Sequence, residues 1–276
     1  LSLFFIGYFE DIKTSIKPNI RLMLMIASLS IIIFFIPVTV FNIDLFFLKL
    51  LLLNSKIFST LFVLLCFLFI INGANLIDGF NGLLAINLII INSILLYINL
   101  NNDQVLELSS SDHLQFSLFI TAQIIILISF LLFNFPEAKI FLGDSGSYLL
   151  GSLIALNTIT TNNLNPNMSS FFFCIILFYL FFEVFFSFLR KLYQRKSPFL
   201  PDGEHLHMLS YKMISRIFDS KKSNYINSLI LNFIYFILVF PSIFYSDNNL
   251  VCKYWFFGLI LIYMLFYFRL YRLTKN

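Results

Sequence analysis

Long apolar runs, broken by short polar clusters, constrain this chain more than any other feature of its sequence. Hydrophobic residues make up 59% of its 276 residues and charged residues only 12%, whereas a soluble domain carries about a quarter charged residues. A helix needs about 20 apolar residues to cross a bilayer. Runs of that length recur throughout, so the sequence predicts an all-α, polytopic integral membrane protein.

The apolar runs predict about eight transmembrane helices in a single membrane-embedded domain, residues 1–276. The run from Phe41 to Leu53 is shorter and is interrupted by Asp44 and Lys49, so we expect it to lie at the membrane interface. The expected spans are residues 20–40, 57–77, 82–100, 113–135, 147–161, 170–189, 224–246 and 250–268.

The first segment, LSLFFIGYF, has no Met and is too short to span a membrane. It has the character of the end of a helix whose beginning is missing. We therefore expect the domain to be N-terminally incomplete, lacking preceding helices, and to be weakly active or inactive by itself.

Basic residues predict the orientation. Threading the helices alternately places fifteen of the eighteen Lys and Arg residues on one side, and Lys49, Lys56 and Lys253 on the other. Lys and Arg concentrate in short cytoplasmic loops, so we expect loops 10–19, 136–146 and 190–222 in the cytoplasm and loop 101–112 outside. This bias and anionic headgroups explain the net charge of +4, so we expect a lipid bilayer but no nucleic acid as partner.

Four polar clusters lie on the predicted cytoplasmic face, which suggests a chemical site there. They are Glu10 with Asp11, NLIDGFNGL (75–83), FLGDSGS (141–147) and SPFLPDGEHLH (197–207).

In NLIDGFNGL, Asn75, Asp78 and Gly82 are spaced three and four apart, which predicts one stripe at the inner end of a helix. Charged groups at membrane depth are costly and usually mark function. The alternative is a helix that stops and restarts, because Asp-Gly and Asn-Gly are common turn pairs.

In FLGDSGS, glycines flank Asp144 just before an apolar helix. Ser145 or Ser147 can cap this helix while its free amides face the cytoplasm. Such a place suits a phosphate beside an Asp-held Mg²⁺. The alternative is simple capping without a ligand.

The loop 190–222 carries Asp202, His205 and His207 among basic residues such as Arg190. The two His residues are two apart, which is poor spacing for a helical zinc site. Imidazole and cationic donors fit a nucleotide or phosphate better, and a solvated loop with incidental His is the alternative. Glu183, in the preceding span, is expected to be a structural ion partner of Arg190.

Four segments of the chain, which occur in this order, are GYFEDIKTSIKPNIRL, NLIDGFNGL, FLGDSGSYLLG and RKSPFLPDGEHLHM, and the resemblance that they carry covers nearly the whole chain. In order and spacing they resemble the polyprenyl-phosphate N-acetylhexosamine-1-phosphate transferases, glycosyltransferase family 4, which include phospho-N-acetylmuramoyl-pentapeptide transferase. The last segment is similar to the N-acetylglucosamine 1-phosphate branch, which makes O-antigen, teichoic acid or related glycan carriers.

The resemblance implies transfer of a sugar 1-phosphate from a UDP-sugar to undecaprenyl phosphate, with release of UMP, to start a cell-envelope glycan such as lipopolysaccharide O-antigen. It implies Mg²⁺, with Mn²⁺ as a substitute, the bacterial inner membrane with a cytoplasmic active site, and a homodimer as a further expectation. The peptidoglycan reaction, an inactive remnant and a lipid-linked-sugar transporter remain alternatives.

The resemblance also implies residue roles. Asp144 matches the metal-binding Asp, with Asp78 as a second candidate ligand, and Asp11 matches the second member of a paired acidic motif. Glu10, Asn81 and Met208 depart from the family, which usually has Asp at the first position, often Asp at the second and frequently a further His at the third. The expected catalytic residues are Asp11, Asp78 and Asp144, and the expected substrate-binding residues are Glu10, Asn75, Asn81, Arg190, Asp202, His205 and His207.

Two other classes fit less well. A transporter should carry its charges near the midplane, whereas these charges lie at helix ends. A CDP-alcohol phosphotransferase needs Ala-Arg after the Asp-Gly pair and its spacer, and none follows Asp78-Gly79.

The lipid phosphate needs no strong general base, because a phosphate monoester has a second pKa of about 6. We therefore expect positioning or metal binding for Asp11. Direct attack is the first expectation for the mechanism, and a covalent phospho-aspartyl route is the alternative.

Overall fold

A computed structural model describes residues 1–12, 16–36, 38–101, 110–198, 200 and 202–275. The described residues contain helices and connecting segments but no strand. The helices are α1 (Ser2–Asp11), α2 (Pro18–Phe35), α3 (Phe46–Asn54), α4 (Lys56–Ile77), α5 (Leu83–Leu100), α6 (Ser110–Asn134), α7 (Gly143–Leu164), α8 (Ser170–Ile176), α9 (Phe178–Tyr193), α10 (Leu206–Ile214), α11 (Ser220–Val239), the 3₁₀ helix η2 (Phe240–Tyr245) and α12 (Asn249–Lys275).

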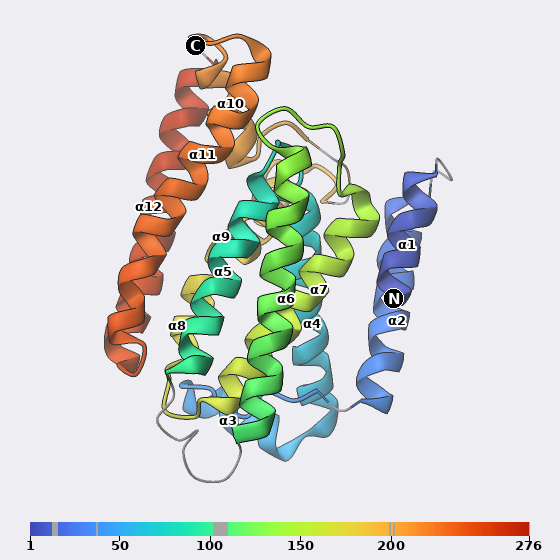
Figure 1. Cartoon of the computed structure of the whole chain (residues 1–276), viewed down its shortest axis with the longest axis vertical. Coiled ribbons are helices and arrows are strands. Elements are labelled where there is room, and N and C mark those ends of the chain that lie inside the picture. Colours follow the sequence, from blue (N-terminus) through green and yellow to red (C-terminus); the bar gives the residue numbers. More distant parts are fainter. Residues whose placement is uncertain (13–15, 37, 102–109, 199, 201, 276) are drawn as a thin grey trace.

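The long helices stand side by side in one bundle (Figure 1). Helix α7 packs against α1, α4 and α5, and α4 packs in addition against α9 and α2. Helix α12 packs against α8 and α10. The short helix α10 and the chain's C-terminus lie at one end of the bundle, and α3 lies at the other end. Segments that connect helices therefore lie at both ends of the bundle, and α10 marks one of these ends.

Six helical segments among the described residues are long and apolar enough to span a membrane, namely α2, α4, α5, residues 113–134 of α6, α11 with η2, and α12. Helices α8 and α9 pass the same test together, but a bend of 78° at Leu177 separates them. The polytopic all-α prediction is confirmed. The expected span at 147–161 corresponds to α7, whose 22 residues are too polar to meet that test.

Polar side chains in the middle of α7 find partners on the helices around it. Asn157 donates to Asn92 on α5 at 3.0 Å and to Gln123 on α6 at 2.9 Å, and Thr161 accepts from Asn99 of α5 at 2.9 Å. A polar group without a partner is costly inside a bilayer, so helices that satisfy one another can span it with little apolar surface. This explains why a test of apolarity alone does not identify α7 as a helix that could span the membrane.

Glycines bring α4 into close contact with its neighbours. A Cβ on Gly73 would lie 2.2 Å from the carbonyl oxygen of Leu180 on α9, and one on Gly151 would lie 2.9 Å from Cα of Ile71 on α4. Small residues let helix backbones approach closely in membrane proteins. The position of α4 between α7 and α9 therefore depends on these glycines.

Two local predictions are decided by the helix ends. Helix α4 stops at Ile77 and α5 restarts at Leu83, with Gly82 between them at φ +76°. The prediction of one helical stripe through Gly82 was wrong, because α4 ends before Gly82, whose left-handed conformation precedes the first turn of α5, and the stop-and-restart alternative is correct. The run 41–53 contains a helix of nine residues, α3, and its interfacial position stays a prediction. Lys13 and most of loop 101–112 lie outside the described residues.

We expect Gly73→Ala to destabilise the folded protein by about 1–3 kcal/mol, because the added methyl group meets backbone on α9 rather than a movable side chain. The matched control is Gly258→Ala on α12, where an added Cβ meets nothing within 4 Å. Thermal unfolding of both variants in the same detergent checks this. Equal melting temperatures would contradict the close α4–α9 contact.

Candidate functional site

Asp11, the last residue of α1, caps the N-terminus of α7. Its Oδ1 accepts from the Asp144 amide at 2.9 Å, and its Oδ2 accepts from the Ser145 amide at 3.1 Å and the Ser145 hydroxyl at 2.7 Å. Gly143, with φ +65°, allows the approach, since a Cβ there would lie 2.7 Å from Oδ2. The prediction of capping by Ser145 or Ser147 was wrong: a carboxylate from another helix occupies the amides that were expected to be free.

Asp144 lies where α1, α2, α4 and α7 meet. Its Oδ1 accepts from Asn75 Nδ2 at 2.5 Å, and its Oδ2 lies 3.7 Å from the guanidinium of Arg21. Arg21 in turn donates to Glu10 Oε1 at 2.7 Å. Asn75 also donates to Ser147 at 3.1 Å, so its amide links α4 to the first turns of α7. We call Glu10, Asp11, Arg21, Asn75, Asp78 and Asp144 the acidic cluster.

Asp78 adds a carboxylate that receives no hydrogen bond from the described residues. Burial raises its pKa to about 7, and the charges of Asp144 and Asp11 act in the same direction. Glu10 Oε2 is also buried and has no hydrogen-bond partner in the part of the chain that the structure describes. Four carboxylates with one arginine among them leave a local excess of negative charge, which a bound cation would stabilise.

Asn81 lies apart from the acidic cluster. Its side-chain amide donates to the carbonyl of Pro136 at 2.8 Å, and its backbone amide donates to Asn224 of α11 at 2.8 Å. The next amide, of Gly82, donates to Asn134 at the end of α6 at 2.7 Å. The structure therefore does not bring Asn81 together with the other expected site residues, and its contacts fasten the α4–α5 turn to α6 and α11.

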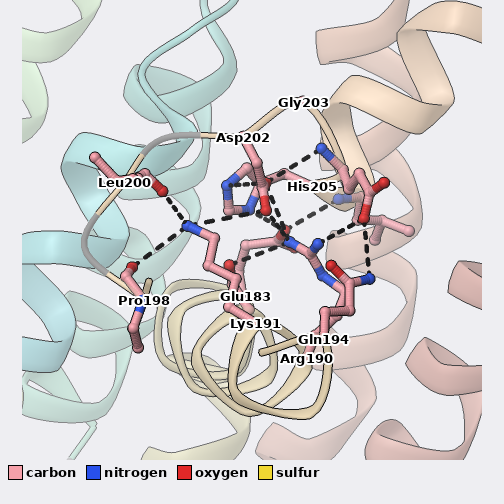
Figure 2. A network of polar contacts seen from close by, with 12 residues as sticks. Glu183, Arg190, Lys191, Gln194, Pro198, Leu200, Asp202, Gly203 and His205 are labelled. Carbon is pink, nitrogen blue, oxygen red and sulfur yellow. Dashed lines mark hydrogen bonds and ion pairs between the residues drawn. The ribbon is translucent and has the colours of Figure 1, made fainter. Parts of the chain in front are cut away.

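The loop after α9 folds back over that helix (Figure 2). Arg190 donates to both carboxylate oxygens of Asp202, at 3.1 and 2.9 Å, and to Glu204 at 2.8 Å. The predicted pair of Glu183 with Arg190 was wrong, because the returning loop supplies Arg190 with two nearer acids. Burial opposes ionisation of Asp202, but Arg190 and His205 outweigh it and lower the Asp202 pKa.

Glu183 instead holds His205. Its Oε1 lies 3.2 Å from His205 Nδ1 and accepts from the Leu206 amide at 3.0 Å. Its Oε2 accepts from the Tyr263 hydroxyl of α12 at 2.7 Å. On the other side of the ring, His205 Nε2 lies 3.3 Å from Asp202 Oδ1. We call Glu183, Arg190, Asp202, Glu204 and His205 the histidine cluster.

His207 is fully buried, and neither ring nitrogen has a hydrogen-bond partner among the described residues. Its ring stacks on His205 with centroids 5.5 Å apart and meets Phe80 edge-on at 5.8 Å. Burial lowers its pKa to about 4, so the ring is neutral at pH 7. The structure thus presents His205 between two acids and places His207 behind it as a packing residue.

The turn that follows α4 joins the two clusters. Asp78 belongs to the acidic cluster by charge, while Phe80 contacts His207 and, with ring centroids 5.0 Å apart, Tyr211 of α10. A Cβ on Gly79 would lie 3.9 Å from the Met208 methyl group. Residues of all four expected motifs therefore gather at one end of the bundle. Asn81, in the same turn as Asp78 and Phe80, contacts Pro136 and Asn224 there instead of the two clusters.

Sequence reasoning missed two contributors. Arg21 was counted only as a basic loop residue, although it stands in the first family-like segment and reaches Glu10 and Asp144. Tyr263 had no signal at all, because one Tyr in an apolar helix is an ordinary core residue. No three His, Cys, Asp or Glu side chains in the described part of the chain are spaced to hold a metal by themselves.

An apolar cavity of about 430 Å³ lies between α3, α4, α7 and the α8–α9 pair. Most of its wall is aliphatic or aromatic, with residues such as Phe62, Phe69, Ile159 and Phe173. Such a space suits an aliphatic chain rather than a polar ligand.

The chain is similar to known transferases. It is 28% identical over 216 residues to undecaprenyl-phosphate alpha-N-acetylglucosaminyl 1-phosphate transferase of Thermotoga maritima, covering 78% of this chain and 61% of that protein. It is 32% identical over 139 residues to a probable undecaprenyl-phosphate N-acetylglucosaminyl 1-phosphate transferase of Bacillus subtilis, covering 50% of this chain and 36% of that protein.

A further relative is phospho-N-acetylmuramoyl-pentapeptide-transferase of Orientia tsutsugamushi, 32% identical over 127 residues, which are 42% of this chain and 34% of that protein. The chain thus spans less than two thirds of the length of these relatives. The model of glycosyl transferase family 4 matches residues 1–162, more than half of the chain and all of the acidic cluster. With this match and the converging motifs, the chain belongs to glycosyl transferase family 4.

Proposed function

We propose that this protein transfers a sugar 1-phosphate, of the N-acetylhexosamine type, from a UDP-sugar to undecaprenyl phosphate and releases UMP. The observation that carries the proposal is the convergence of Asp11, Asn75 and Asp144 at the N-terminus of α7. The names of the T. maritima and B. subtilis relatives support the sugar and the lipid acceptor. The peptidoglycan reaction is a second candidate because phospho-N-acetylmuramoyl-pentapeptide transferases also match, over shorter stretches.

The acidic cluster fits a hard divalent cation. Mg²⁺ is commonly held by one or two carboxylates, with waters and substrate phosphates completing its octahedron. Asp144 and Asp78 would be those ligands, and the unpartnered Glu10 Oε2 is a further hard oxygen nearby. When bound, Mg²⁺ would supply positive charge to the pyrophosphate and to the departing UMP.

The reaction needs positioning more than proton transfer. An oxygen of undecaprenyl phosphate forms a bond to the sugar-bearing phosphorus, while the bond from that phosphorus to the bridging oxygen breaks and its electron pair leaves with UMP. Asn75 orients Asp144 by the 2.5 Å hydrogen bond, and Arg21 lies beside both Glu10 and Asp144 as a fixed positive charge. Side chains held this way keep the reacting groups aligned.

The contacts of Asp11 favour direct attack. Both of its oxygens already accept hydrogen bonds from the first turn of α7. A nucleophilic Asp11 would have to leave those amides and uncap the helix. Its position suits a residue that holds the Asp144 backbone in place, and the apolar cavity suits part of the prenyl chain of the acceptor.

We further propose that the site faces the cytoplasm of a bacterium, from the plasma membrane. Fluorescent or epitope tags placed in the loop 101–112 should be accessible from outside intact cells, and tags at Lys221 or after Lys275 only after permeabilisation. The reason is the distribution of Lys and Arg, fifteen residues against three. The opposite labelling pattern would remove the site from the cytoplasmic UDP-sugar pool and contradict the proposed function.

Asp144→Asn should lower transfer at least 100-fold, because it removes the charge of the best-placed metal ligand while leaving an oxygen to accept from Asn75. The assay uses radiolabelled UDP-N-acetylglucosamine and undecaprenyl phosphate, with membrane content measured for each variant. The exposed Asp247→Asn, beyond η2, is the matched control and should keep full activity. Chelation should inactivate the parent, and added Mg²⁺ or Mn²⁺ should restore it; turnover in Asp144→Asn or in chelator would contradict the metal role.

The two histidines should differ in what their loss changes. His205→Ala should lower transfer about tenfold or more at matched folded protein, because it removes the ring that lies between Glu183 and Asp202 on the polar side of the loop. His207→Ala should lower stability by about 1–2 kcal/mol, because it leaves a gap against Phe80. Transfer rates at matched folded protein, together with melting curves, separate the two effects. Identical behaviour of the variants would contradict the division of roles.

A further inference from the structure

Glu183 lies inside the apolar helix α9, and both oxygens of its carboxylate have polar contacts. Only 1% of the residue is exposed, and its two oxygens accept hydrogen bonds from the Leu206 amide and the Tyr263 hydroxyl, while Oε1 also lies 3.2 Å from His205 Nδ1. An ionisable residue in a membrane-spanning segment is costly and usually serves function. No step of the proposed transfer uses Glu183 directly, so its retention in an apolar helix calls for another reason.

The geometry around His205 supplies that reason. Its Nδ1 faces Glu183 at 3.2 Å and its Nε2 faces Asp202 at 3.3 Å. A neutral imidazole carries one N–H, and the ring nitrogen that donates is set by the partner it meets. Glu183 also accepts from the backbone amide of Leu206, the first residue of α10. One carboxylate therefore fixes both the ring and the start of the helix that follows it.

Other charged or titratable groups surround this pair from every side. Arg190 and Lys191 of α9 act on Asp202, at 2.9 and 3.9 Å. Further neighbours among the described residues are Tyr179 on α9, Glu204 in the loop, His207 on α10, and Tyr263 and Tyr267 on α12. Arg190 pairs with Asp202 and Glu204 and not with Glu183. The Glu183 carboxylate is therefore available to His205 Nδ1.

We infer that Glu183 is a positioning residue that holds the N–H at Nδ1 of His205 and so fixes the ring with Nε2 toward Asp202 and the polar side of the loop. The inference rests on the proposed function for its catalytic meaning: phosphate oxygens accept hydrogen bonds, so His205 would meet the phosphates of a UDP-sugar through an N–H at Nε2 while Glu183 holds the one at Nδ1. Tyr263 supports the carboxylate from behind, and the neighbouring Tyr267 donates to the Glu204 carbonyl at 2.9 Å. Through these two hydroxyls the last helix, α12, holds the histidine loop in place.

The protonation of His205 can be measured without substrate. The chain has three His residues, so a ¹⁵N-histidine-labelled sample gives three imidazoles, and His→Ala variants assign them. In the parent, His205 Nδ1 should give the signal of a protonated nitrogen. In Glu183→Gln the amide keeps the shape but is a weaker acceptor than a carboxylate, so Nδ1 should lose its proton while Nε2, beside Asp202, is the protonated nitrogen. An Nδ1 signal that does not change in Glu183→Gln would overturn the inference.

Kinetics test the same inference in the reaction. Glu183→Gln should raise the KM for UDP-N-acetylglucosamine about tenfold with kcat changed by less than twofold, and Tyr263→Phe should raise it about threefold. Tyr271→Phe, on the same helix, is the matched control and should match the parent, because the Tyr271 ring stacks on Tyr267 and its side chain also contacts Lys275. A fall in kcat at constant KM would indicate lost folded protein and would contradict positioning.

The two readouts separate the inference from the proposed function. If the parent transfers no sugar phosphate from any UDP-sugar but Nδ1 loses its proton in Glu183→Gln, the inferred role of Glu183 toward His205 is supported and the proposed function fails. If the parent transfers but Nδ1 is unprotonated, the inference fails and the proposed function stands.

Discussion

A polar helix can stand in a membrane bundle only if its neighbours satisfy its polar groups, and this constraint governs the arrangement around α7. Asp11 supplies acceptors for its first amides, Asn75 joins its first turn to α4, and Asn157 pairs with α5 and α6 in its middle. At the far end, Asn162 donates to the Asn42 carbonyl at 3.1 Å. The hydrogen bonds that fix α7 within the bundle therefore also position Asp144. The stability of the helix packing and the geometry of the site depend on one set of hydrogen bonds.

The two polar clusters solve the problem of buried charge in different ways. In the histidine cluster, acids and bases are matched: Arg190 meets Asp202 and Glu204, and Glu183 meets His205 and Tyr263. In the acidic cluster they are not matched, and burial raises the Asp78 pKa to about 7. Matched charges keep a loop in one conformation, whereas an unmatched carboxylate is ready to receive a cation. This contrast supports a structural and positioning role for the first cluster and a metal-binding role for the second.

Sequence alone was sufficient for the membrane class and for the approximate place of the six described helices that are long and apolar enough to span a membrane, because hydrophobicity is read locally. It was less informative about helix ends and partners. Gly82, with a φ of +76°, precedes the first turn of α5; Asp11 caps a helix far away in sequence; and Arg190 pairs with acids of the returning loop rather than with Glu183. Each of these depends on how distant segments pack, which no spacing rule encodes. The different surroundings of the two histidines likewise depend on tertiary packing, because Phe80 lies against the ring of His207.

The departures from the family pattern have physical reasons in the contacts of this chain. Glu10, one methylene longer than Asp, reaches Arg21 at 2.7 Å. Asn81 donates its amide to the Pro136 carbonyl; an ionised Asp could not donate and would set a carboxylate against that oxygen. Met208 lies against the turn at Gly79, where a flexible apolar side chain fills the space beside it. Position 81 therefore serves here to fasten the turn that carries Asp78, and the charge that many family members place there is not needed for that purpose.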